Sequence, residues 1–234
     1  MVSELLEQTH EILRYDLNPE FVETLSIDIA WRYDRLYEEL RADSALPFEL
    51  KLAEFAARRS SCAIRAMVFA SQQHGVPYSF RYLECNGQEK ILVKMGRIVV
   101  IQEPFLELSD APRIADYKRE LADTHGLIRQ LELNFGDVPN RDLDWSGGIL
   151  AVLLHGASGP RFTRRDRALG GLMLAVPDGE YATWITRLDL HRIAMFGIER
   201  RPLSPDDGKE ADRPQLQKDE VVVRLKKQNK IIRV

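Results

Sequence analysis

The sequence is poor in cysteine, since only Cys62 and Cys85 occur among its 234 residues. Two thiols cannot form the disulfide framework that stabilises small secreted domains. The N-terminus carries Glu4 and Glu7, where a secretory signal has basic residues followed by an apolar run. We therefore expect a reduced, cytoplasmic setting.

Long apolar runs are also missing. The longest, residues 147–154, has the length of a strand, whereas a membrane-spanning helix needs about 20 apolar residues. We therefore expect no membrane partner. Apolar residues make up 44% of the chain and charged residues 29%, which is the composition of a folded domain and not of a disordered chain.

No sign of charge dominates, because the formal net charge is only −3. The whole molecule therefore has no general attraction for nucleic acid, and any such binding must come from a local basic patch. The cations are 24 Arg and 9 Lys. An excess of Arg suits phosphate recognition, but it also suits ordinary surface ion pairs and a GC-rich bacterial genome.

Residues 1–75 show helical patterning. A short helix is expected over residues 3–13, and Asn18-Pro19-Glu20 then supplies an N-cap, a proline at the first helical position and an acid in the first turn. Apolar residues follow at spacings of three and four up to Leu40. Another helix is expected to begin between Ser44 and Pro47 and to end at His74-Gly75.

From Tyr78 the apolar period changes to two, which predicts a three-stranded β-meander over residues 79–102. Its turns are expected at Asn86-Gly87 and Gly96-Arg97, so that Glu84 would lie opposite Glu89 and Phe80 opposite Val93. One face of the meander, with Phe80, Tyr82, Ile91, Val93, Ile98, Val100 and Gln102, is expected on the core. The other face is half basic and half apolar, with Arg81, Lys90, Lys94, Arg97 and Glu103 on it.

Further along the chain we predict a helix over 109–125, a strand near 127–135 with helix as the alternative, and buried strands at 149–155 and 169–176. A last helix is expected to begin at Asp178. The fold class is therefore α+β: an N-terminal helical region (1–75), then a domain (76–199) with a mixed or antiparallel sheet flanked by helices. Residues 200–219 have the composition of a linker, and 220–234 that of a basic hairpin tail.

An Arg-rich segment follows the first buried strand. Gly156 and Gly159 permit close backbone approach, and four arginines, Arg161, Arg164, Arg165 and Arg167, lie within seven residues. The G-K-[ST] element of a P-loop is absent. The segment is therefore a candidate phosphate contact or, alternatively, an exposed loop with acidic partners such as Asp166.

The order helix, β-meander, helix invites comparison with metal-dependent nucleases of the PD-(D/E)xK type, which need carboxylates that converge on Mg²⁺ and a nearby Lys. The candidate acids Glu84, Glu89 and Glu103 divide between two faces, and no D…ExK spacing occurs. His155-Gly156-Ala157-Ser158-Gly159 looks like the HG segment of α/β-hydrolases, but no G-x-S-x-G nucleophile motif accompanies it. No histidine pairs with cysteine at zinc spacing, so no metal and no cofactor are expected.

The function predicted from these patterns is that of a non-enzymatic regulatory or accessory protein that contacts DNA or RNA through local basic surfaces. The expected phosphate contacts are Arg161, Arg164, Arg165, Arg167, Arg81, Lys94, Lys226 and Lys227. The alternative is a protein-interaction subunit or homo-oligomer that uses the helical stripes and the tail from Val221 to Val234. A second alternative is a divergent metal-dependent nuclease.

Overall fold

A computed structural model describes residues 2–83, 88–105, 111–116, 118–119 and 149–196, and the structural statements below concern these residues. The predicted strand at 127–135, the linker at 200–219 and the tail at 220–234 lie outside them, as does most of the helix predicted over 109–125. No helix in the described ranges is both long enough and apolar enough to cross a membrane.

Three helices open the chain: α1 (Val2–Asp16), α2 (Pro19–Ala42) and α3 (Phe48–His74). The predicted start of α2 is confirmed, because the Asn18 side chain accepts hydrogen bonds from the backbone N–H groups of Glu20 and Phe21. The predicted end of α3 is confirmed as well. Gly75 closes it in the left-handed conformation, with φ of +62°.

Six strands form one mixed sheet in sequential order, with β3 and β4 parallel and every other neighbouring pair antiparallel. The predicted α+β class is therefore confirmed. The strands are β1 (Tyr78–Leu83), β2 (Gln88–Met95), β3 (Ile98–Pro104), β4 (Ile149–Ala157), β5 (Leu169–Pro177) and β6 (Trp184–Asp189).

The predicted register of the first hairpin was wrong by two residues. Phe80 pairs with Ile91 instead of Val93, and Leu83 pairs with Gln88, so residues 84–87 connect the strands instead of Asn86-Gly87 alone. The preference of Asn-Gly for a tight turn is local, whereas register follows from pairing along the whole strand. Because the shift is even, every side chain keeps its predicted face.

The second predicted turn, at Gly96-Arg97, is confirmed by the pairing of Met95 with Ile98. Gly96 has φ of +53°, which favours glycine. The Asp16 carboxylate packs against this glycine and accepts hydrogen bonds from the Arg97 backbone N–H at 2.9 Å and from Arg97 Nε at 2.6 Å. The turn thereby attaches the end of α1 to the sheet.

The helix predicted from Asp178 was also wrong over residues 178–189. The Asp178 carboxylate caps a hairpin turn, where it accepts hydrogen bonds from the backbone N–H groups of Ala182 and Thr183. The chain then continues as β6, and only α7 (Leu190–Phe196) is helical. The aromatic and β-branched residues of 183–186 favour a strand, and pairing with β5 outweighs their helical spacing.

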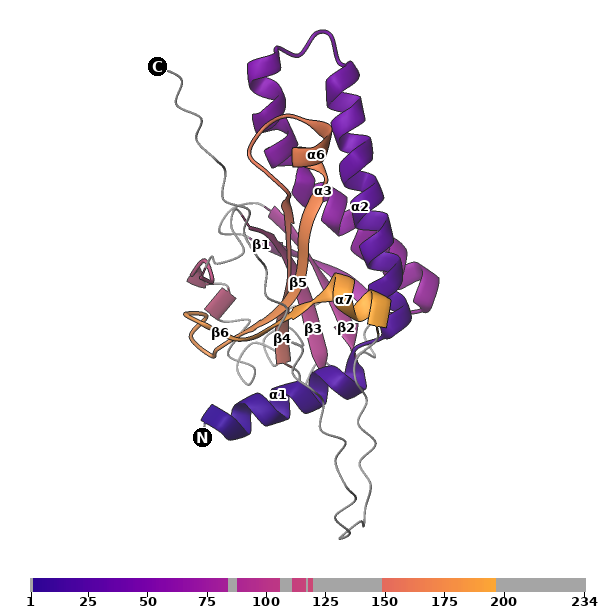
Figure 1. The fold of residues 1–234 in the computed structure, drawn as a ribbon. Coiled ribbons are helices and arrows are strands. Elements are labelled where there is room, and N and C mark those ends of the chain that lie inside the picture. The colour runs from indigo at the N-terminus through magenta and orange to yellow at the C-terminus, as the bar shows by residue number, and fades with distance from the viewer. Residues whose placement is uncertain (1, 84–87, 106–110, 117, 120–148, 197–234) are drawn as a thin grey trace, which may run out of the picture. The chain divides into compact units, whose positions relative to one another are not determined.

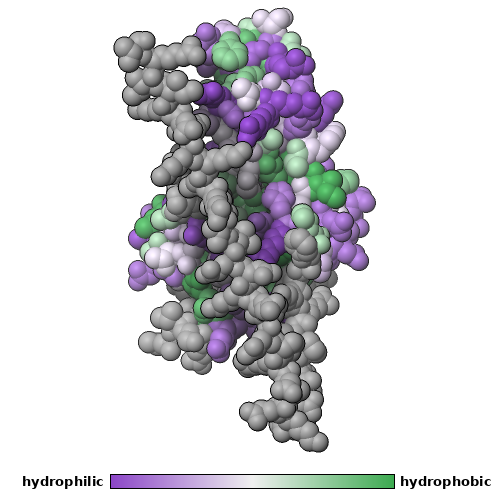
Figure 2. Space-filling view, in the orientation of Figure 1, coloured by the Kyte–Doolittle hydropathy of each residue, from purple (hydrophilic) through white to green (hydrophobic). Residues whose placement is uncertain are grey.

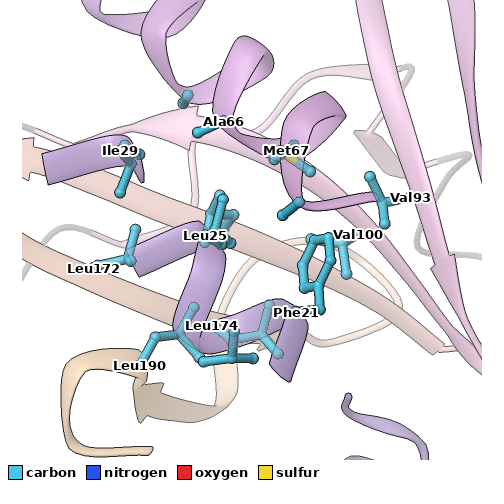
Figure 3. Close-up of a cluster of buried hydrophobic side chains, with 14 of the residues drawn as sticks. Phe21, Leu25, Ile29, Ala66, Met67, Val93, Val100, Leu172, Leu174 and Leu190 are labelled. Atoms are coloured by element: carbon cyan, nitrogen blue, oxygen red, sulfur yellow. The ribbon is translucent and has the colours of Figure 1, made fainter. Parts of the chain in front are cut away.

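Helices α2 and α3 lie side by side and cover one face of the sheet (Figure 1). In the core between them, Phe21, Leu25 and Ile29 of α2 meet Met67 of α3 and the strand residues Val93, Val100, Leu172 and Leu174 (Figure 3). This side of the sheet is therefore the helix-covered face. The predicted burial of Phe80 and Tyr82 on it was wrong, because these edge-strand side chains are 41% and 61% exposed.

The opposite face of the sheet carries a second, smaller apolar cluster formed by Leu92, Val99, Ile101, Leu150, Val152, Leu154, Ala175 and Tyr181, together with Phe105. Strand alternation places Arg81, Lys90 and Glu103 on this same side. The second face thus combines apolar packing with charged groups, as the sequence predicted.

Candidate anion-binding surfaces

The Arg-rich segment folds into a tight loop around a single helical turn, α6 (Arg164–Arg167). The Thr163 hydroxyl caps this turn by accepting a hydrogen bond from the backbone N–H of Asp166. The Asp166 carboxylate in turn accepts the backbone N–H of Arg161. The loop is therefore held by its own polar side chains.

Two of the four loop arginines are already engaged within the fold. Arg164 donates to both carboxylate oxygens of Asp34 on α2, at 3.0 and 3.1 Å. Arg167 is only 5% exposed. Its guanidinium donates to the backbone oxygens of Arg161 and Gly159, and it lies over the ring of Phe55 at 5.2 Å.

Arg161 and Arg165 differ from these two, because their side chains are exposed and make no hydrogen bond or ion pair with any residue that the structure describes. The loop therefore presents two open guanidinium groups instead of the four counted in the sequence. Only Arg161 and Arg165, of the four phosphate contacts predicted in this loop, therefore have side chains without a partner among the described residues.

On the second face of the sheet, two cations face each other across neighbouring strands. Arg81 of β1 is the direct cross-strand partner of Lys90 of β2. Like charges in this position destabilise a sheet, so their juxtaposition calls for a compensating group. Continuing the β2–β3 register places Glu103 of β3 next to Lys90.

Glu103 is buried and already has two partners. Lys118 Nζ lies 2.6 Å from its Oε1, and the Tyr181 hydroxyl donates to the same oxygen at 3.2 Å. Lys118 Nζ also donates to the backbone oxygen of Arg113 at 2.7 Å. We refer to Arg81, Lys90, Glu103, Lys118 and Tyr181 as the sheet-face cluster.

Among the described residues of the sheet-face cluster, three cations, Arg81, Lys90 and Lys118, lie near one carboxylate, that of Glu103. Burial lowers the pKa of Lys90; the charge of Glu103 opposes this shift, and that of Lys118 adds to it. Arg81 Nη1 is buried without a hydrogen-bond partner in the described ranges. Such a group is costly unless a ligand or water satisfies it, so the cluster is a candidate anion site.

Of the other predicted phosphate contacts, only some lie on the same face of the sheet as this cluster. Lys94 lies on the same face, two residues beyond Leu92 on β2. Lys226 and Lys227 lie outside the described residues. The structure thus brings Arg81 and Lys94 to one face and places the 161–167 loop against α2 on the other side of the sheet.

The carboxylates proposed for a nuclease site do not converge. Glu89 is exposed and belongs to the helix-covered face, whereas Glu103 belongs to the other face and is tied to Lys118. Glu84 lies outside the described residues. Within the ranges given above, no group of three or more His, Cys, Asp or Glu side chains is placed to hold a metal ion.

Sequence reasoning missed a buried polar triad between α2 and the sheet. The Tyr33 hydroxyl lies 2.6 Å from His155 Nδ1, and His155 Nε2 lies 2.9 Å from Gln102 Oε1. Since the amide oxygen only accepts, Nε2 carries the proton and Nδ1 accepts from Tyr33. The hydrolase-like interpretation of residues 155–159 is not supported, because His155-Gly156 is a continuous part of β4.

The triad is closed to solvent, since Tyr33 and His155 are both 0% exposed. Burial raises the pKa of Tyr33 and lowers that of His155 to about 3, with the positive charges of Arg59 and Lys90 adding to the shift of His155. His155 is therefore neutral and joins α2 to the sheet; no part of the ring is open to a substrate.

This burial predicts that the protein loses stability in mild acid. The unfolded chain protonates His155 below its ordinary pKa of 6.5, whereas the folded chain does not do so until about pH 3. The unfolded state therefore binds more protons over this range, and stability falls as the pH falls. We expect a loss of about 2 kcal/mol between pH 7 and pH 5 from this residue alone.

Urea denaturation at a series of pH values measures this effect. His155→Gln, which cannot protonate, serves as the matched variant. Its stability should depend less on pH over the same interval. Equal pH slopes for the wild type and His155→Gln would contradict a neutral, buried His155.

Comparison of the chain with protein-family models, curated proteins and solved structures finds no match.

Proposed function

We propose that this protein is a non-enzymatic accessory protein that binds single-stranded nucleic acid, and that the sheet-face cluster holds the phosphates. The observation that carries the proposal is the pairing of Arg81 with Lys90 across β1 and β2. Two half-buried cations are placed directly opposite each other, while the only carboxylate beside them among the described residues is shared with Lys118.

A bound phosphate would relieve this arrangement. A guanidinium and an ammonium group that face one anion form charge-assisted hydrogen bonds, which are stronger than neutral ones. The anion would also supply an acceptor for Arg81 Nη1, which lacks one within the described chain. In the free protein Arg81 and Lys90 repel each other, whereas in the complex both would be attracted to the bound phosphate.

The edge strand favours a single strand over a duplex. Phe80 and Tyr82 flank Arg81 in sequence and are 41% and 61% exposed on the other side of the same edge. Exposed aromatic rings beside basic residues offer stacking surfaces for unpaired bases. A single strand that follows β1 would have phosphates at Arg81 and bases at the rings.

The experiment is a binding titration of labelled mixed-sequence single-stranded DNA and RNA by fluorescence anisotropy. Arg81→Ala combined with Lys90→Ala should weaken binding at least tenfold. Arg161→Ala with Arg165→Ala removes the same charge from the 161–167 loop and should change affinity less than threefold. A larger loss for Arg161→Ala with Arg165→Ala than for Arg81→Ala with Lys90→Ala would place the binding site on the 161–167 loop instead. A wild type that binds neither DNA nor RNA would reject the proposal.

Stability provides an independent check on the same variants. Replacing Arg81 and Lys90 removes both their mutual repulsion and the attraction of Lys90 for Glu103, so the free energy of unfolding should change little. A weaker binder that is equally stable has lost contacts with the ligand and not its fold. Including Mg²⁺ or EDTA in parallel reactions also tests the nuclease alternative, which requires cleavage that depends on the metal.

The interaction-subunit alternative stays a prediction. Large apolar side chains are exposed at the start of α3, where Phe48 is 65% and Leu50 is 53% exposed. Figure 2 shows hydrophobic side chains among hydrophilic ones at this end of the α2–α3 pair. Exposed apolar residues occur singly on the surface of many monomers. They therefore support a protein-interaction role less strongly than the paired cations of the sheet-face cluster support nucleic acid binding.

A further inference from the structure

A second pair of cations lies beneath the helices, on the other side of the sheet from the sheet-face cluster. Phe55 and Arg59 are four residues apart on α3 and therefore occupy the same helical face. Both are buried, and Arg59 is 9% exposed. Arg167 comes from the 161–167 loop and places its guanidinium over the Phe55 ring, which brings it next to Arg59.

The part of the chain that the structure describes gives the guanidinium of Arg59 no hydrogen-bond or ion-pair partner. Its Nε is enclosed and lacks a hydrogen-bond acceptor among the described residues. The side chain forms no ion pair within the same ranges. A buried donor of a charged group costs more when it is unsatisfied than a neutral donor does, so Arg59 Nε calls for an acceptor.

Neighbouring groups add positive charge to the same place. Burial lowers the pKa of Arg167, an effect that the Asp166 carboxylate opposes and the Arg59 charge increases. The Asp166 carboxylate already accepts the backbone N–H of Arg161. Tyr33 lies beside both arginines, but its hydroxyl proton is committed to His155. Within the described ranges, these two largely buried arginines thus have one carboxylate nearby, and that carboxylate already accepts a backbone hydrogen bond.

We propose that Arg59 and Arg167 form an enclosed site for a small oxyanion of the size of phosphate or sulfate. Guanidinium groups present planar forks of N–H donors that match the oxygens of such an ion. Arg167 uses its Nε and Nη2 for the loop carbonyls, which leaves Nη1 for the anion. Because Arg59 and Arg167 are only 9% and 5% exposed, the site admits an ion and not a nucleic acid strand.

Inorganic phosphate is the probe that tests this site, with chloride at equal ionic strength as the reference. A ligand that binds only the folded state raises the melting temperature in a saturable way. We expect such a rise for the wild type, and we expect broadening of the ³¹P resonance of phosphate in the presence of protein. Sulfate should compete for the site.

Adjacent arginines on α3 supply a matched pair of variants. Arg58 is the neighbour of Arg59 but forms a surface ion pair with Glu39. Arg59→Met should weaken phosphate binding at least tenfold, whereas Arg58→Met should bind as the wild type does. Without phosphate, Arg59→Met should be as stable as the wild type or more stable, because the variant removes an unpaired buried charge.

The results that overturn the proposal are distinct from those that reject nucleic acid binding. A wild type that gives neither the melting shift nor the ³¹P broadening has no oxyanion site, and equal losses in the two variants would mean nonspecific screening. Arg81→Ala with Lys90→Ala should keep the phosphate response in full. If a saturating oligonucleotide abolishes the response, the phosphate binds at the strand site instead of at Arg59 and Arg167.

Discussion

Replacing His155 by alanine is expected to lower the free energy of unfolding by about 4 kcal/mol. The imidazole connects α2 to two strands through its contacts with Tyr33 and Gln102, at 2.6 and 2.9 Å. Its removal leaves the Tyr33 hydroxyl and the Gln102 amide oxygen buried without these partners, and it opens a cavity in the core. Chemical denaturation followed by circular dichroism measures the loss.

The matched control is Tyr33→Phe, which keeps the ring and its edge-to-face contact with Phe55, where the ring centroids are 5.6 Å apart. This variant removes one hydrogen bond and leaves His155 Nδ1 without its donor, so we expect a loss of about 1 to 2 kcal/mol. A His155→Ala variant no less stable than Tyr33→Phe would show that the triad does not hold α2 on the sheet.

Replacing Glu103 by glutamine is expected to destabilise the protein by about 3 kcal/mol or more. The side chains of Glu103 and Lys118 are only 10% and 7% exposed, and their charged atoms lie 2.6 Å apart. Without the carboxylate, the Lys118 ammonium stays buried without this counterion, and Lys90 loses the attraction of the Glu103 charge. Breaking one side of a buried pair costs more than the pair itself contributes.

The double variant Glu103→Leu with Lys118→Met separates these two effects. It removes both charges and retains apolar volume, so its stability should lie closer to that of the wild type than the stability of Glu103→Gln does. Urea denaturation of the three proteins under one buffer condition supplies the comparison. A Glu103→Gln variant as stable as the wild type would mean that the ion pair is not enclosed in solution.

Local sequence features predicted the parts of the fold that depend on local chemistry. Asn18-Pro19 starts α2 and Gly75 ends α3, because capping and positive φ are properties of a few adjacent residues. The Gly96-Arg97 turn follows from the same reasoning. The predicted register of β1 against β2 and the predicted helix from Asp178 were wrong, because pairing between strands outweighed the local preference in both places.

The candidate sites depend on contacts that no local pattern reveals. Alternation along the strands correctly placed Arg81 and Lys94 on one face of the sheet. The four arginines of residues 161–167 looked alike in the sequence, but Asp34, which pairs with Arg164, is 130 residues away. Tyr33 and Gln102 are 122 and 53 residues from His155. Only the assembled fold shows that this histidine is structural.

The dependence of oligonucleotide binding on salt tests the central claim most directly. Each phosphate contact on a single strand contributes about 0.7 to the slope of log affinity against log salt. The wild type should show a clear negative slope, and Arg81→Ala with Lys90→Ala, which removes the one phosphate contact that these two cations share, should reduce its magnitude by about 0.7. A slope that is unchanged in this variant, or that falls only when Arg161 and Arg165 are replaced, would contradict phosphate binding at the sheet-face cluster.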